Sequence, residues 1–243
     1  MDWIFGIHAV QSVLKTAPER VLELVVQNGR QDDRLKKVQR LAEQHGIALQ
    51  WASLKNITSK VNGRHQGVIA RCSDGPTYDE SFLYQLAEKS AEKSFFLMLD
   101  GVTDPHNLGA CLRSAACAGV DAVIVPKDNS VGLTPTVQKV ASGAAEVIPL
   151  IMVTNLSRTI LRLQELGVWV VGTSGDASTS IYELDLRGAC MLVMGSENAG
   201  LRELTKKHCD FLAKIPMLGD VESLNVSVAA GVTLFEVVRQ RGT

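Results

Sequence analysis

Short apolar runs alternate with helix-like stretches over the C-terminal two thirds of the chain. Strands are predicted at 95–100, 122–126, 168–173, 191–195 and 211–216. Helices are predicted at 107–118, 135–143, 155–166, 200–208 and 224–238. Strands that are apolar throughout and alternate with helices are typical of a parallel sheet that is covered on both faces. The pattern therefore predicts an α/β fold for this part of the chain.

The first third of the chain predicts a separate and smaller α/β module. Its strand-like runs lie at 21–26, 47–51 and 67–72, and a charged helix is predicted across 32–44. The polar stretch that follows contains Gly75-Pro76, which favours a linker, and a short helix is predicted at 82–93. We therefore divide the chain into a module at 1–73, a linker at 74–93 and a larger domain at 94–243.

Charge differs between these parts. Residues 1–73 carry 11 Lys and Arg against 6 Asp and Glu, although the net charge of all 243 residues is −1. A basic module joined to a slightly acidic domain is typical of a nucleic-acid-binding domain attached to an enzyme. A well-solvated surface explains the positive charge of the module equally well. No apolar run suits a membrane span and the N-terminus lacks a signal-peptide pattern, so we expect a cytoplasmic protein. The five cysteines and five histidines lack ligand spacing, so we expect reduced thiols and no metal site.

Several of the predicted strands end in Gly, Pro or small polar residues. Open α/β sheets bind ligands at the carboxyl ends of their strands, so we expect the functional site in the loops after these strands. No GxGxxG follows the first strand of the sheet, and no GxxxxGK[ST] is present. These absences argue against dinucleotide-binding and P-loop proteins.

The segment DGVTDPHNLGACLRSA at 100–115 begins at the end of the first strand of the larger domain. A turn is predicted at Asp104-Pro105, and Asn107 is placed to cap a helix that carries Arg113 among small and apolar residues. Two interpretations stay open. Arg113 serves the functional site, or it is a surface residue that pairs with Asp100 or Asp104.

Two later segments also place polar residues after strands. In LVMGSENAGL at 192–201, Glu197 follows the end of a predicted strand. Its carboxylate either orients a polar or basic partner, or is simply favoured at the start of the next helix by the helix dipole. A segment that begins IPMLGDVESLNVSVAAG at Ile215 leads into a helix of small residues that carries Asn225 and Ser227. Small residues of this kind also serve close helix packing alone.

Together the three segments resemble the SpoU-type, TrmH-like RNA 2′-O-methyltransferases of the SPOUT superfamily. The family patterns DPxNxGxxxRxA, GxExxGL and IPMxGxxxSLNVSVA match at 104–115, 195–201 and 215–229, with Asn198 where many members have Gly. FGIHAVQSVL at 5–14 and RHQGVIA at 64–70 resemble the two ends of the family's L30e-like substrate-binding domain. Within the family, the chain is most similar to bacterial enzymes that methylate a guanosine ribose of 23S ribosomal RNA.

The resemblance implies a catalytic domain with a C-terminal trefoil knot, S-adenosylmethionine as cofactor, and a homodimer that acts on 23S ribosomal RNA or a ribosome assembly intermediate. It implies that loop main-chain groups hold the cofactor, at Thr173, Ser174, Gly175, Gly195, Ser196, Ile215, Pro216, Met217, Ser223, Leu224 and Asn225. The implied catalytic residues are Asn107, Arg113, Glu197, Asn225 and Ser227. In the basic module, the expected phosphate contacts are Arg20, Arg30, Arg34, Lys36, Lys37 and Arg64.

The family analogy makes Arg113 the group that activates the 2′-hydroxyl. A guanidinium stays protonated, so we expect Arg113 to bind the adjacent phosphate and to stabilise the developing alkoxide electrostatically. Three alternatives remain open at this point. They are an enzyme that acts on transfer RNA, a noncatalytic RNA-binding protein with a methyltransferase fold, and an unrelated nucleotide-binding oxidoreductase.

Overall fold

The computed structural model describes residues 2–30, 32–61, 63, 65–73, 75, 77–90, 92–197 and 199–242. The chain divides into two compact units. The smaller unit contains Met1–Pro76 and Ser142–Val147, and the larger unit contains Thr77–Ala141 and Ile148–Thr243.

The smaller unit is built on a four-stranded sheet with the order β1-β4-β2-β3. β1 (Asp2–Phe5) and β2 (Val21–Gln27) pair antiparallel with β4 (Val68–Cys72), and β3 (Leu49–Ala52) pairs parallel with β2. Helices α1 (Ile7–Thr16) and α2 (Asp33–Gln44) contribute to the core on one face, and α3 (Leu54–Lys60) to a smaller cluster on the other. The elements predicted between 21 and 72 are found close to their expected positions, whereas β1, α1 and α3 were not predicted from periodicity.

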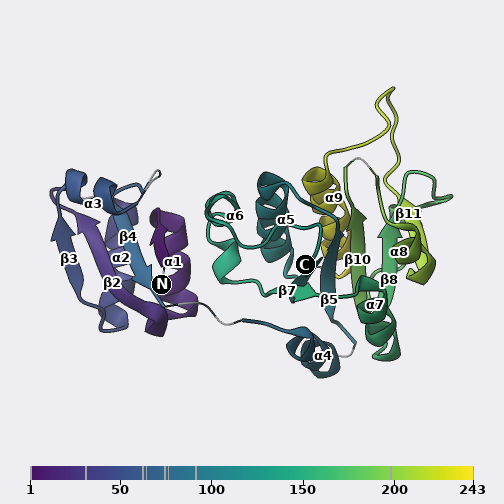
Figure 1. The fold of residues 1–243 in the computed structure, drawn as a ribbon, viewed down its shortest axis with the longest axis horizontal. Coiled ribbons are helices and arrows are strands. Elements are labelled where there is room, and N and C mark those ends of the chain that lie inside the picture. The colour runs from purple at the N-terminus through teal and green to yellow at the C-terminus, as the bar shows by residue number, and fades with distance from the viewer. Residues whose placement is uncertain are drawn as a thin grey trace. The chain divides into compact units, whose positions relative to one another are not determined.

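The larger unit contains a parallel sheet with the order β7-β6-β5-β10-β8-β11-β9 (Figure 1). Its strands are β5 (Phe95–Asp100), β6 (Ala122–Pro126), β7 (Leu150–Val153), β8 (Trp169–Thr173), β9 (Thr179–Ser180), β10 (Cys190–Gly195) and β11 (Phe211–Lys214). The predicted α/β fold with a parallel sheet is confirmed. The predictions lacked β7 and β9, because β7 is a four-residue run next to Pro149 and the two residues of β9 are polar.

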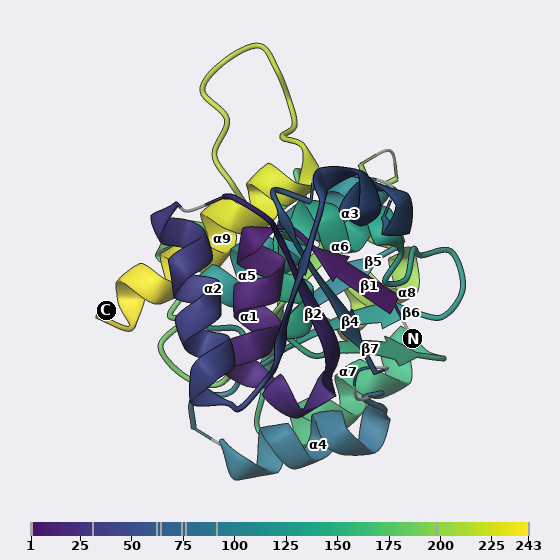
Figure 2. The same ribbon diagram turned by 90° about the vertical axis from the view of Figure 1, so that its left-hand side faces the viewer.

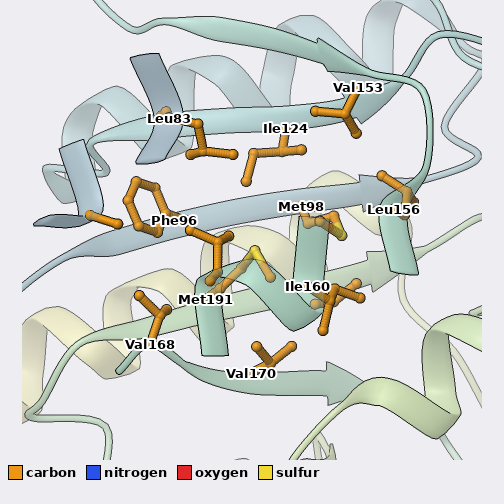
Figure 3. Packing of buried hydrophobic residues seen from close by; sticks show 14 of the residues in the cluster. Leu83, Phe96, Met98, Ile124, Val153, Leu156, Ile160, Val168, Val170 and Met191 are labelled. Carbon is orange, nitrogen blue, oxygen red and sulfur yellow. The ribbon is translucent and has the colours of Figure 1, made fainter. Parts of the chain in front are cut away.

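Helices cover both faces of this sheet. On one face, α4 (Glu80–Lys89) and α7 (Leu156–Glu165) enclose a core that includes Phe96 and Met98 of β5 (Figure 3). Elsewhere α5 (Pro105–Ala118) packs against both α6 (Pro135–Ala141) and α9 (Val226–Gln240), and α9 contacts β10. The short helix α8 (Glu203–His208) and the 3-10 turn η3 (Ile181–Glu183) also belong to the larger unit, whereas the 3-10 turns η1 (Pro18–Arg20) and η2 (Ala144–Glu146) belong to the smaller unit.

Part of the segment predicted as a linker is ordered helix. Within 74–93, residues 80–89 form α4, whose Leu83 and Ala87 are fully buried in the core of the larger unit. The apolar side chains of this helix explain why it packs on the domain instead of bridging two modules. The boundaries of the proposed domains otherwise stay predictions, as does the trefoil knot.

All five cysteines are free, and burial raises the pKa of the Cys111 thiol to about 12. No helix in the described part of the chain is long and apolar enough to cross a membrane.

Two glycines in the packed helices have very different surroundings. A Cβ at Gly109 of α5 would lie 2.7 Å from Val140 Cβ and 2.9 Å from the carbonyl oxygen of Val137, both in α6. A Cβ at Gly231 of α9 would find Ser114 Oγ as its nearest neighbour, at 3.8 Å. The absence of a side chain at Gly109 therefore allows α6 to pack close to α5, whereas the space beside Gly231 is large enough for a methyl group.

We predict that Gly109→Ala lowers the free energy of unfolding by about 1–3 kcal/mol, because α6 must move away from α5. Gly231→Ala is the matched control. It should leave this free energy unchanged or raise it by up to about 1 kcal/mol, because alanine loses less conformational entropy in a helix. Urea unfolding followed by circular dichroism measures both, and equal stability of the two variants would contradict the prediction.

Candidate active site

Three segments that are distant in the sequence meet beyond the carboxyl ends of β5, β10 and β11. Helix α5 begins five residues after β5 ends, a short turn at 196–200 follows β10, and a long loop leads from β11 into α9 (Figure 1). In a parallel sheet the carboxyl ends of all strands lie at the same edge. This edge carries Asn107, Glu197 and Asn225.

The side chains of these three residues form one hydrogen-bonded network. Asn107 Nδ2 donates to Glu197 Oε1 at 3.0 Å. Asn225 Nδ2 donates to Asn107 Oδ1 at 3.0 Å and also to Glu197 Oε1. A carboxylate is an acceptor, and here one of its oxygens receives both amides. The network therefore fixes the orientation of the Glu197 carboxylate.

The network continues into the first turn of α9. Asn225 is the N-cap of this helix, and its Oδ1 accepts from the Ser227 main-chain N–H at 2.9 Å and from the Ser227 hydroxyl at 2.6 Å. Among the described residues, no side chain or main-chain group donates to Glu197 Oε2. This oxygen of an exposed carboxylate is available to a further donor.

Two local expectations about these segments are wrong. Asp104, and not Asn107, is the N-cap of α5, because Pro105 occupies the first helical position and the Asp104 carboxylate accepts from His106 N at 2.9 Å. Asn107 is 7% exposed and uses its amide in the network instead. Glu197 does not begin a helix either, since α8 starts at Glu203 and Gly200 pairs back with Ser196.

The turn that carries Glu197 depends on a glycine. Ser196 N–H donates to Gly200 O at 3.1 Å, and Gly200 N–H donates to Ser196 O at 2.9 Å. A Cβ at Gly195 would lie 2.1 Å from the Gly200 carbonyl carbon and 2.3 Å from Leu201 N. No side chain fits at Gly195 unless the backbone of the turn moves.

The structure also reveals an ion pair beside this turn that the sequence interpretation missed. The Asp100 side chain is fully buried at the end of β5, and its Oδ1 accepts from Arg202 Nε at 2.6 Å. Asp100 is the only charged residue in an apolar strand, FFLMLD, and a buried carboxylate requires a partner. That signal pointed to a pair but not to Arg202 as its partner.

Arg113 is exposed on α5, nearly two turns beyond Asn107. The suggestion that it pairs with Asp100 or Asp104 is wrong, because Asp100 binds Arg202 and Asp104 caps α5. Among the described residues, no hydrogen-bond or ion-pair partner of Arg113 is found. The guanidinium is therefore free to bind a ligand, and its catalytic role stays a prediction.

The residues expected to hold a cofactor lie in loops at the same edge of the sheet. The Thr173 hydroxyl donates to Val193 O at 3.2 Å, which ties the end of β8 to β10, and Ser174 N–H donates to Ala213 O of β11 at 3.0 Å. The ranges 215–217 and 223–225 form the two ends of the long loop that extends beyond the sheet (Figures 1 and 2). Within this loop Leu218 is fully exposed.

The basic residues of the smaller unit fall into two groups. Arg20 has a side chain that is only 14% exposed, and it pairs with Glu146 at 2.8 Å. Arg30 bonds Asp32 at 2.7 Å and Gln66 O at 2.9 Å. These contacts favour structural roles for both arginines.

The second group lies on α2. Arg34, Lys36 and Lys37 are exposed there, and Arg40, which the sequence interpretation did not single out, is exposed on the same helix. Arg64 lies outside the described residues. Among the described residues of this unit, α2 thus carries a group of four exposed basic side chains, and contact with RNA stays a prediction.

Family models match both parts of the chain. Residues 94–235 match the SpoU rRNA methylase family. The chain belongs to this family. Residues 3–77 match the model described as RNA 2′-O ribose methyltransferase substrate binding. The resemblance read from the three segments is confirmed, and the alternative of an unrelated oxidoreductase is wrong.

Individual relatives extend over nearly the whole length. The chain is 55% identical over 238 residues to the 23S rRNA (guanosine-2′-O-)-methyltransferase RlmB of Coxiella burnetii, covering 98% of this chain and 95% of that protein. It is 53% identical over 241 residues to RlmB of Escherichia coli, covering 99% of each. The fold resembles that of the SpoU methyltransferase AviRb of Streptomyces viridochromogenes, crystallised with AdoMet, with a TM-score of 0.79, 22% identity, and coverage of 98% and 90%.

We predict that Gly195→Ala lowers the rate of methyl transfer on the order of 10²-fold, because the turn must shift and displace the Glu197 carboxylate. Gly188→Ala is the matched control, since a Cβ there meets no atom within 4 Å. Melting temperature and initial rate are measured for both variants. A folded Gly195→Ala protein with the wild-type rate would show that the position of this turn does not matter.

Proposed function

We propose that this chain transfers a methyl group from S-adenosylmethionine to the ribose 2′-hydroxyl of a guanosine in 23S ribosomal RNA. The observation that carries the proposal is the network of Asn107, Glu197 and Asn225, which joins the three family segments at one sheet edge. Membership of the SpoU family and more than half identity to two RlmB enzymes support the substrate.

The loops at this edge fit an adenosine-containing cofactor. Residues 173–175, 195–196, 215–217 and 223–225 contain no charged side chain. They offer main-chain N–H and C=O groups, which can read the edge of an adenine, together with the apolar side chains of Ile215 and Leu224. When bound, S-adenosylmethionine supplies an electrophilic methyl group on a sulfonium. The residues of the chain must orient the ribose and help its 2′-hydroxyl to lose a proton.

We assign these tasks to the polar residues of the edge. Glu197, oriented by Asn107 and Asn225, presents Oε2, to which no described residue donates, to the ribose or to Arg113. The Arg113 guanidinium binds the neighbouring phosphate and stabilises the oxyanion that develops on the 2′-oxygen. Asn225 and Ser227, which are hydrogen-bonded to each other, supply the remaining polar side chains of this edge. Arg113 cannot serve as a literal base, because its guanidinium stays protonated.

We also propose that the chain acts as a cytoplasmic homodimer. Helix α9 presents apolar side chains to solvent at Val228 and Phe235, which are 51% and 49% exposed, and the half-buried Val232 lies between them on the same stripe. An apolar stripe on a packed helix is suited to self-association. A monomer in analytical ultracentrifugation at working concentrations would contradict this part of the proposal.

The function is tested by methyl transfer to 23S ribosomal RNA transcripts, with the modified nucleotide mapped afterwards. We predict that Arg113→Ala lowers the rate on the order of 10²–10³-fold, because it removes one electrostatic contact to the transition state. Cofactor affinity, measured by calorimetry, should survive the substitution.

Arg162→Ala, which removes another exposed helical arginine of the same unit, should keep the wild-type rate. Methylation of transfer RNA alone would redirect the proposal to that substrate. RNA binding by the wild type with no transfer to any RNA would favour the noncatalytic alternative.

We propose that α2 of the smaller unit contacts RNA phosphates. Replacing Arg34, Lys36 and Lys37 together by alanine should weaken RNA binding and lower the slope of log affinity against log salt by about 2–3, because each phosphate contact releases a counterion. The control replaces the exposed Lys15, Lys55 and Lys89, which changes the net charge equally. An identical salt slope in both triple variants would contradict the assignment to α2.

A further inference from the structure

The buried Asp100 carboxylate has both oxygens occupied by one residue. Oδ1 accepts from the Arg202 guanidinium Nε at 2.6 Å, and Oδ2 accepts from the Arg202 main-chain N–H at 3.2 Å. The Asp100 side chain is fully buried, whereas 53% of the Arg202 side chain is exposed. A buried carboxylate is costly unless it is paired and hydrogen-bonded, so this contact is strongly favoured in the folded state.

Asp100 contacts the chain at both ends of the turn that carries Glu197. In the parallel ladder of β5 and β10, Asp100 is the partner of Gly195, which immediately precedes the turn. Its carboxylate holds Arg202, which follows the turn after the buried Leu201. One residue thus fixes where the turn leaves the sheet and where it returns.

Asp100 also precedes the other half of the site. Four residues after it, Asp104 caps α5, and the first turn of this helix supplies Asn107 to the Glu197 carboxylate. Gly101 lies against the turn as well, since a Cβ there would come within 3.8 Å of Ser196 Cβ. Asp100 and its contact with Arg202 therefore fix the distance between Asn107 and Glu197.

We propose that Arg202 is a positioning residue that acts through Asp100 to hold Glu197 in its catalytic orientation. The proposal rests on the function proposed above. Neither Asp100 nor Arg202 belongs to the residues that the family resemblance assigned to catalysis or to cofactor binding. Arg202 does not need to touch RNA or cofactor in this role, because its guanidinium is already directed at Asp100.

The geometry makes arginine specific at this position. The Nε–H and the main-chain N–H of one residue reach the two oxygens of one carboxylate, which fixes both the direction and the register of the chain at 202. A lysine keeps the charge but offers a compact ammonium on a flexible stem, so it would hold Asp100 without fixing that direction. Arg202→Lys should therefore restore part of what Arg202→Ala loses.

Kinetics test the coupling between Arg202 and Glu197. We expect Arg202→Ala to lower kcat by about 10–100-fold with little change in the KM for RNA, because a misplaced group affects the transition state. Arg202→Lys should give an intermediate kcat. In a Glu197→Ala background, Arg202→Ala should change kcat by less than about 3-fold, since two residues that act as one unit are not additive.

Arg187→Ala is the matched control for the loss of an exposed arginine, because Arg187 pairs with the exposed Asp185 at 2.7 Å. It should leave kcat unchanged. Melting temperatures confirm that each variant is folded, so that a loss of rate reports on the site.

Hydrogen exchange supplies a readout that does not depend on activity. In Arg202→Ala the amides of Ser196, Gly200 and residue 202 should exchange at least about 10-fold faster, because local opening becomes easier. Unchanged exchange at these amides, or an equal loss of kcat with and without Glu197, would overturn the inference. An inactive wild type would refute the proposed function alone, and the exchange rates would still decide whether Arg202 holds the turn.

Discussion

The site depends on one acceptor atom, Glu197 Oε1, which receives the amide groups of Asn107 and Asn225. These amides come from helices that begin after different strands, so a single carboxylate oxygen joins segments more than a hundred residues apart. The parallel sheet makes this possible because it delivers the carboxyl ends of its strands to one edge. Removing the acceptor would leave the amide N–H of the buried Asn107 without its partner, which is costly, whereas the exposed Asn225 amide would keep Asn107 Oδ1 as an acceptor.

Much of the larger unit could be predicted because its strands are apolar throughout. Five strands were found within two residues of their expected bounds, since full burial imposes a continuous apolar run. The short edge strands β7 and β9 lacked that signal. The beginning of α5 was misplaced by the competition between Asp104 and Asn107 for the cap, which Pro105 decides in favour of Asp104.

The site itself was only partly predictable. The resemblance to the family singled out Asn107, Glu197, Asn225 and Ser227, but the direction of each hydrogen bond depends on tertiary structure. The ion pair of Arg202 could not be predicted from the sequence, because its partner Asp100 lies 102 positions away. The arginines show the same limit. Sequence could not distinguish Arg20, which pairs with Glu146, from Arg113, for which no partner is found in the described part of the chain.

The strand order of the larger sheet has a consequence for solubility. A sheet edge offers unpaired N–H and C=O groups on which another chain can add a strand and begin to aggregate. Here one edge is β9, which has only two residues, and the other is the four-residue β7, preceded by Pro149, which has no N–H to donate. Both borders are too short to template a further strand, so the hydrophobic interior of this sheet is protected against edge-to-edge aggregation.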